Sequence, residues 1–170
     1  MKNSPNNIIA LSFLGLLLCS CWNQNDDPKP PDQLPPYSQI GANTMGCLIN
    51  GRVFIPREHD LKGKYFGCHD DDLTMYIDRK GERVYIGIWD KTVTDTGAYD
   101  LTYVNAQKNV FYLPAFGGGF RTNPLHTGKL HIQYWDKQKH IMAGTFYFDA
   151  IGDDSSIVHI TDGRFDMIYN

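Results

Sequence analysis

Residues 73–89 read LTMYIDRKGERVYIGIW, and this stretch decides the fold class. Apolar side chains alternate with others on both sides of a four-residue break at 79–82, which is typical of two strands joined by a tight turn. Pairing Asp78 with Arg83 gathers the apolar side chains on one face: Leu73, Met75, Ile77, Val84, Ile86 and Ile88. The sequence therefore predicts an antiparallel hairpin with one face in a core.

Two dipeptides elsewhere in the chain are typical of type I′ hairpin turns. Asn50-Gly51 and Asp162-Gly163 each lie between two short runs in which apolar residues alternate. A two-residue turn at Asp162-Gly163 would place His159 opposite Asp166 on the solvent side. We therefore expect one hairpin around Asn50-Gly51 and another over residues 157–169.

A fourth hairpin is predicted from residues 129–135 to residues 141–150, and Tyr99–Tyr103 and Val110–Leu113 have the composition of two further strands. This gives about ten short strands, and each clear pair is adjacent in sequence. We expect an all-β fold, either a single antiparallel meander sandwich or a partly open β-barrel.

The first twenty residues have the features of a lipoprotein signal peptide. An apolar run, too short to span a bilayer, ends in Leu18-Cys19-Ser20-Cys21, which resembles a bacterial lipobox. The resemblance implies that Cys21 is the lipid attachment site and carries acyl chains such as palmitate. The alternative is an ordinary secretion signal, in which case Cys21 is one more thiol.

The chain is predicted to have three parts: the signal peptide (1–20), a lipidated Cys and tether (21–43), and an all-β domain (44–170). Five of the nine prolines fall in the tether, together with three Asp residues, which favours an extended spacer. The expected location is the cell envelope, lipid-anchored to the outer membrane. Whether the domain faces the periplasm or the cell surface stays open.

Three blocks of the chain resemble a group of uncharacterised Bacteroidetes-type lipoproteins. Residues 41–56, GANTMGCLINGRVFIP, are similar to that group's opening GANTFGCLVNG.VW.P, with Met45 and Phe54 where Phe and Trp are usual. Residues 143–148, AGTFYF, are similar to its SGTFEF, and residues 160–166 match its ITDGRFD. The resemblance implies a small β-domain on a lipid anchor, and it implies no activity.

Two cysteines lie within the predicted domain, and two states stay open for them. Cys47 and Cys68 could form a disulfide, since the compartment is oxidising, or both could be buried free thiols. The run Cys68–Asp72, CHDDD, lacks the ligand spacing of a calcium loop or a zinc site. We interpret it as a solvated turn, and we expect no metal and no cofactor.

Composition and motifs argue against an enzyme and against a nucleic-acid binder. The net charge is −3 without a basic block. After Cys21 the chain has three serines, none in a nucleophile elbow, and only two glutamates. A hydrolase using Asp or His is a less favoured alternative to a non-enzymatic binding or scaffolding domain whose ligand is unknown.

Outward-facing aromatic and polar side chains are the candidate ligand platform, for a glycan or a protein partner. Strand alternation places seven of them opposite the predicted core: Tyr76, Tyr85, Trp89, His131, Gln133, Trp135 and Tyr147. Flat rings with amide or imidazole neighbours suit a carbohydrate. The alternative is packing across the sheet, which is favoured by the gap that Gly87 would leave beside Tyr76 and Tyr85.

Overall fold

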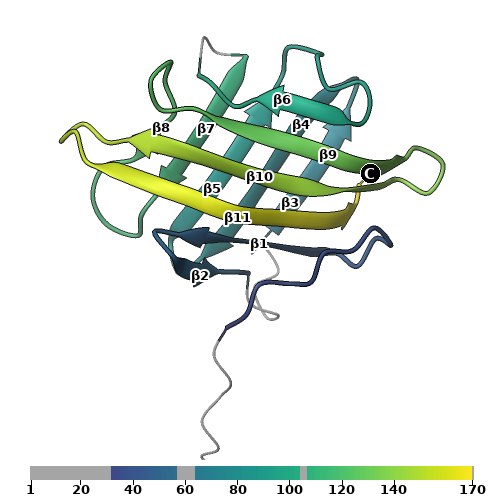
Figure 1. Cartoon of the computed structure of the whole chain (residues 1–170), viewed down its shortest axis with the longest axis horizontal. Coiled ribbons are helices and arrows are strands. Elements are labelled where there is room, and N and C mark those ends of the chain that lie inside the picture. The colour runs from purple at the N-terminus through teal and green to yellow at the C-terminus, as the bar shows by residue number, and fades with distance from the viewer. Residues whose placement is uncertain (1–31, 57–63, 104–106, 170) are drawn as a thin grey trace, which may run out of the picture. The chain divides into compact units, whose positions relative to one another are not determined.

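The computed structural model describes residues 32–56, 64–103 and 107–169, which form one curled antiparallel β-sheet (Figure 1). No helix in the described part of the chain is long and apolar enough to cross a membrane. The strands within these residues are β1 (Thr44–Ile49), β2 (Arg52–Phe54), β3 (Lys64–His69), β4 (Asp72–Arg79), β5 (Glu82–Ile88), β6 (Gly97–Asp100), β7 (Lys108–Leu113), β8 (Phe120–Arg121), β9 (Gly128–Asp136), β10 (Ile141–Ile151) and β11 (Ile157–Ile168). The all-β prediction is confirmed.

The sheet folds over on itself into two layers. The front layer has the order β2-β1-β11-β10-β9-β6, and the rear layer has the order β8-β7-β5-β4-β3. β8 joins them, because it pairs with both β7 and β10. Figure 1 shows the front strands crossing the rear strands, so the sheet forms a half-barrel with the core between its layers.

The predicted hairpins over residues 73–89 and around Asn50-Gly51 are confirmed. In the β4–β5 hairpin Asp78 pairs with Arg83, as predicted, and the six core side chains of residues 73–89 are each at most 2% exposed. At the β1–β2 turn Asn50 has φ 49° and Gly51 has φ 81°. Both values lie in the left-handed region that a type I′ turn requires.

The β9–β10 hairpin is confirmed with one change of side. The register shifts between Ala143 and Gly144, which leaves Gln133 as an extra residue on β9. The bulge exchanges the faces of the next two side chains. Trp135 lies opposite the core residue Met142 and packs against the core, so its predicted outward position is wrong. Tyr134, which strict alternation from Ile132 would turn inward, is only half-buried.

The predicted hairpin at Asp162-Gly163 is wrong. Residues 157–168 form one continuous strand, β11, which lies between β1 and β10. Asp162, at φ 50°, is the extra residue of a β-bulge, since the register shifts here against both neighbouring strands. His159 therefore does not face Asp166: its Nδ1 lies 2.7 Å from Oδ1 of Asp149 on β10.

Candidate functional site

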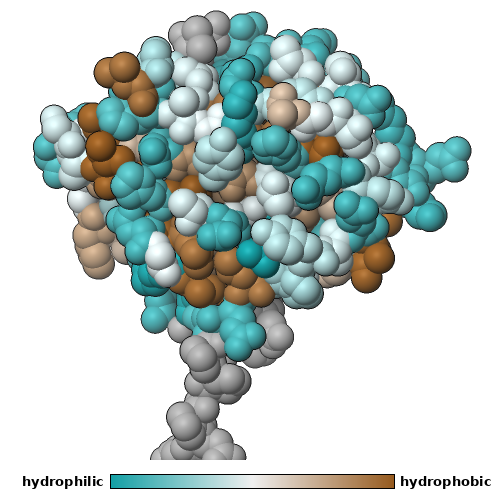
Figure 2. All heavy atoms as spheres, viewed as in Figure 1, coloured by the Kyte–Doolittle hydropathy of each residue, from teal (hydrophilic) through white to brown (hydrophobic). Residues whose placement is uncertain are grey.

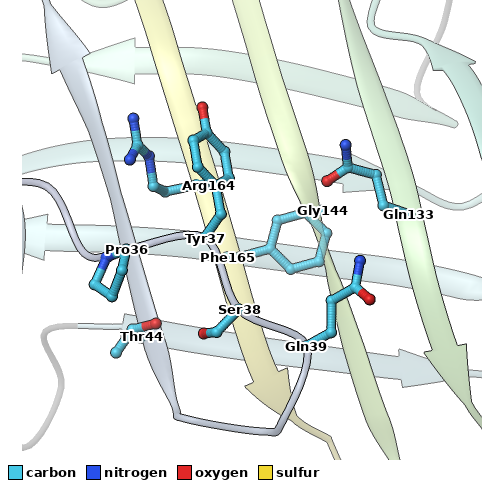
Figure 3. Close-up of a pocket in the computed structure, with 9 residues that line it drawn as sticks. All are labelled: Pro36, Tyr37, Ser38, Gln39, Thr44, Gln133, Gly144, Arg164 and Phe165. Atoms are coloured by element: carbon cyan, nitrogen blue, oxygen red, sulfur yellow. The ribbon is translucent and has the colours of Figure 1, made fainter.

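Residues 32–43, called the strap below, lie against the front layer, although they form no strand (Figure 3). The compact unit begins at Asp32 rather than at residue 44. Asp166 holds the strap at its centre: its carboxylate accepts hydrogen bonds from Ser38 Oγ at 2.6 Å and from the N–H groups of Ile40 at 3.1 Å and Gly41 at 2.7 Å. A segment expected to be a spacer is thus part of the domain.

Asp166 is 1% exposed, and its environment favours the charged form. Burial by itself raises the pKa of the Asp166 carboxyl, but the hydrogen bonds from Ser38, Ile40 and Gly41 outweigh it and lower the pKa overall. A charged, buried acceptor is stable here because strap donors surround it. The strap and Asp166 therefore depend on one another.

Ion pairs and ring contacts hold the strap on either side of Asp166. Asp32 is 2.6 Å from Nη2 of Arg79 on β4. The guanidinium of Arg164 lies over the Tyr37 ring, 4.1 Å from its centroid, and donates from Nη1 to the Pro35 carbonyl at 3.1 Å. The strap is thus attached to both layers of the sheet.

A cavity of about 280 Å³ lies between the strap and the front layer; we call it the strap pocket. Apart from Pro36 and Gly144, the residues that line it are polar or aromatic, and one of them carries a positive charge: Pro36, Tyr37, Ser38, Gln39, Thr44, Gln133, Gly144, Arg164 and Phe165. Figure 3 shows Tyr37 between Arg164 on one side and Gln39 and Gln133 on the other. The pocket is therefore built jointly by the strap and the sheet.

A larger concavity, about 890 Å³, lies where the β7–β8 and β10–β11 loops meet the β1–β2 turn; we call it the loop cleft. Its walls include Tyr112, Gly117–Gly119 and Asp153. Phe116 lies on its rim and is 93% exposed. Figure 2 shows apolar side chains along the left edge of the molecule, the end at which Figure 1 places the β10–β11 loop.

One wall of the loop cleft is fixed by an ion pair. Nη2 of Arg52, on β2, lies 2.6 Å from Oε2 of Glu82, on β5, so this pair joins the two layers. Burial raises the pKa of the neighbouring Tyr112 hydroxyl, and the charge of Glu82 acts in the same direction. Tyr112 therefore stays a neutral hydrogen-bonding group at physiological pH.

The rear-layer residues of the predicted platform belong to a row of aromatic rings. Tyr65, Tyr76, Tyr85 and Phe111 lie opposite one another on β3, β4, β5 and β7. Tyr65 stacks on Tyr76 with ring centroids 5.4 Å apart, and Tyr85 stacks on Phe111 at 4.8 Å. Because a carbohydrate needs an open ring face, rings that cover one another are poorly placed to bind it.

Trp89 and Arg83 complete the packing of this face. A Cβ at Gly87 would lie 2.7 Å from Cζ2 of Trp89, so the indole fills the gap that the glycine leaves, as expected. Nε1 of Trp89 donates to Thr74 Oγ1 at 2.9 Å. The Arg83 guanidinium lies over Tyr76, 4.6 Å from the ring centroid.

The remaining platform residues lie on the front layer, so the seven are not brought together. His131, Gln133 and Tyr147 are exposed on its outer face, and Gln133 lines the strap pocket. Trp135 turns inward and donates from Nε1 to the Tyr169 hydroxyl at 2.6 Å. The seven residues are therefore divided between two opposite outer faces and the core side.

Both cysteines of the domain are free thiols in the structure, but only Cys47 is buried as the alternative of two buried thiols expects. Cys47 is fully buried on β1 opposite Phe54, and Cys68 is half-buried on β3. Asp70 and Asp71, at φ 50° and 66°, form the β3–β4 turn, which confirms the predicted turn. Among the described residues no three His, Cys, Asp or Glu side chains are grouped to hold a metal ion.

No family model, curated protein or solved structure matches this chain. The predicted lipid attachment site, Cys21, and the signal peptide lie outside the described residues.

Sequence reasoning missed the side chains that shape both concavities. The predicted hairpin at Asp162-Gly163 places Asp166 on the solvent side, and the composition of residues 32–43 predicts a spacer. Neither pattern singles out Tyr37 or Arg164. One signal was available: Phe116 precedes three consecutive glycines, and a large apolar residue in such a loop has little to pack against.

Proposed function

We propose that this chain is a lipid-anchored binding protein of the cell envelope, tethered through Cys21 and not an enzyme, and that its ligand is a glycan held in the loop cleft. The observation that carries the proposal is Phe116, an aromatic side chain that is 93% exposed on the rim of a cavity of about 890 Å³. Cavities of this volume are typical of ligand sites.

Phe116 is suited to stack on the apolar face of a sugar ring. Nothing lies within 4 Å of a Cβ built at Gly117 or Gly118, so the loop leaves open space beside the ring. Gly117 has φ 98°, a conformation that other residues rarely adopt. The loop thus presents a flat apolar ring to solvent, the arrangement from which carbohydrate stacking gains free energy.

The β10–β11 loop, which also lines the cleft, supplies polar groups for hydroxyls. Asp153 has no hydrogen bond or ion pair with any described residue, so its carboxylate is available to accept hydrogen bonds from a ligand. Asp154 is engaged instead, since its Oδ1 accepts from the N–H and the hydroxyl of Ser156. A free acceptor and an open ring lining the same cavity are the kinds of group by which proteins orient a sugar.

Affinity gel electrophoresis on a broad polysaccharide panel tests the proposal. We expect at least one polysaccharide to retard the protein, Phe116→Ala to weaken this binding about tenfold, and Asp153→Asn to weaken it as well. Leu125→Ala is the matched control, because Leu125 is 87% exposed but does not line the cleft. Retardation by none of the polysaccharides, or an equal loss in the control, would overturn the glycan proposal.

The anchor and the absence of catalysis are tested separately. In the full chain, Cys21→Ala is expected to move the protein from the membrane fraction to the soluble fraction; a variant that stays with the membrane contradicts the lipid anchor. Turnover of any ester, glycoside or peptide substrate in a hydrolase screen would replace the binding proposal with an enzymatic one.

A further inference from the structure

We propose that the strap pocket is a second binding site and that it takes a single sugar unit bearing a carboxylate, of the uronic acid class. The site shares no lining residue with the loop cleft. The proposal for the strap pocket is therefore tested independently of the proposed function of the loop cleft.

The charge of the pocket favours an anionic group. Among the described residues, Arg164 is the one charged side chain in its lining, and no Asp or Glu of this part of the chain lines it. Nη1 of Arg164 donates to the Pro35 carbonyl, and Nε is 3.4 Å from the Asp162 carbonyl. Nη2 has no partner among the described residues and is available for a carboxylate oxygen, the preferred acceptor of a guanidinium.

The carboxylate of Asp166 does not compete with the ligand for this cation. Its oxygens accept from Ser38, Ile40 and Gly41, all on the strap. Asp166 is also 1% exposed and does not line the pocket. The negative charge that fixes the strap is thus kept apart from the positive charge that faces the cavity.

Neutral groups in the lining fit the rest of a sugar ring. The side-chain amides of Gln39 and Gln133 have no hydrogen-bond partner within residues 32–56, 64–103 and 107–169, and each can both donate to and accept from a hydroxyl. The Tyr37 ring is 62% exposed although Arg164 covers one face. Its other face can stack on the ring carbons of a sugar.

The size of the cavity limits the ligand to one unit. About 280 Å³ is at the lower end of the range for small-molecule pockets, which excludes an oligosaccharide lying within it. Because Tyr37 and Gln39 belong to the strap while Gln133 and Arg164 belong to the sheet, a bound unit would contact both. Occupancy is therefore expected to hold the strap against the front layer.

Two-dimensional amide NMR titrations with D-galacturonate and D-galactose test the proposal, since the two sugars differ only in the carboxylate. We expect saturable shifts at residues 37–39 and at Gln133 with galacturonate, and about tenfold weaker binding of galactose. Arg164→Gln is expected to abolish the preference for galacturonate. Gln133→Ala, which leaves every strap contact in place, is expected to weaken galacturonate binding.

His131→Ala is the matched control, since His131 is exposed on the same outer face of β9 but does not line the pocket. It is expected to bind galacturonate like the parent, and so is Phe116→Ala in the loop cleft. The proposal is overturned if neither sugar gives saturable shifts, if both bind equally well, or if Arg164→Gln and Gln133→Ala bind like the parent. Loss of polysaccharide binding in Phe116→Ala together with unchanged galacturonate binding would show that the two sites are separate.

Discussion

Replacing Asp166 by Asn tests whether a buried carboxylate fixes the strap. The carboxylate accepts three hydrogen bonds at 2.6–3.1 Å, and a hydrogen bond to a charged group contributes about 1.5–3 kcal/mol. The Asn amide keeps one acceptor oxygen, but its NH₂ group is a donor that faces the donors of the strap. If the strap is released, its N–H and hydroxyl groups form hydrogen bonds with water, which offsets part of the loss. We therefore expect a net loss of about 2 kcal/mol in the free energy of unfolding at pH 7, or about 5–10 °C in Tm.

The same substitution predicts a change in acid stability. The pKa of Asp166 is lower in the folded protein than in the unfolded chain. Its contribution to the free energy of unfolding is therefore fully present above about pH 4, the pKa of an unfolded Asp, and is lost as the pH falls through the folded pKa. We therefore expect the parent protein and Asp166→Asn to differ less in their free energy of unfolding at pH 3 than at pH 7. Urea unfolding at both pH values measures this difference.

The control for this experiment is Asp162→Asn on the same strand. Asp162 is exposed, its side chain has no hydrogen-bond partner among the described residues, and Asn tolerates its positive φ. If Asp166→Asn unfolds within about 0.5 kcal/mol of this control, the surface-substitution range, the carboxylate does not hold the strap.

One further substitution and one labelling reaction probe the packing. Gly87→Ala should destabilise the domain by about 1–2 kcal/mol, because the new Cβ meets the Trp89 ring at 2.7 Å. Gly118→Ala, which has open space around its Cβ, is the control and should not destabilise it. Equal stabilities of the two variants in thermal unfolding would contradict the packing on the rear face. Burial raises the pKa of the Cys47 thiol well above its usual value. In thiol labelling of the native protein at pH 8, Cys47 should therefore stay unmodified, while the less buried Cys68 should react. Rapid labelling of Cys47 would contradict its burial.

Local alternation predicts which side chains are buried better than it predicts which strands pair. In residues 157–169 the core residues Val158, Ile160, Phe165 and Met167 are buried as expected, although the predicted hairpin does not exist. Before residue 162 the inward side chains have even numbers (Val158, Ile160), and after it they have odd numbers (Phe165, Met167). A two-residue turn and a one-residue bulge both produce this change. The sequence pattern is therefore the same for both, and the long-range pairing of β11 with β1 and β10 decides between them.

The candidate sites were harder to predict because each depends on segments distant in sequence. The strap pocket brings strap residues near Tyr37 together with Gln133 and Arg164, and the loop cleft brings Phe116 together with Asp153. The bulge at Gln133 moved Trp135 from the outer face to the core side. The joining of distant segments and the bulge both depend on long-range pairing. The residues around Gln133 and around the strap therefore carry no local signal for either.

The most direct test of the proposed function is an amide NMR titration of the domain with the polysaccharide that retards it most strongly in the affinity gel. We predict that the shifts concentrate in residues 115–120 and 152–156, the two loops of the cleft. Shifts confined to the rear aromatic row around Tyr76 and Tyr85, with the loops unaffected, would contradict it.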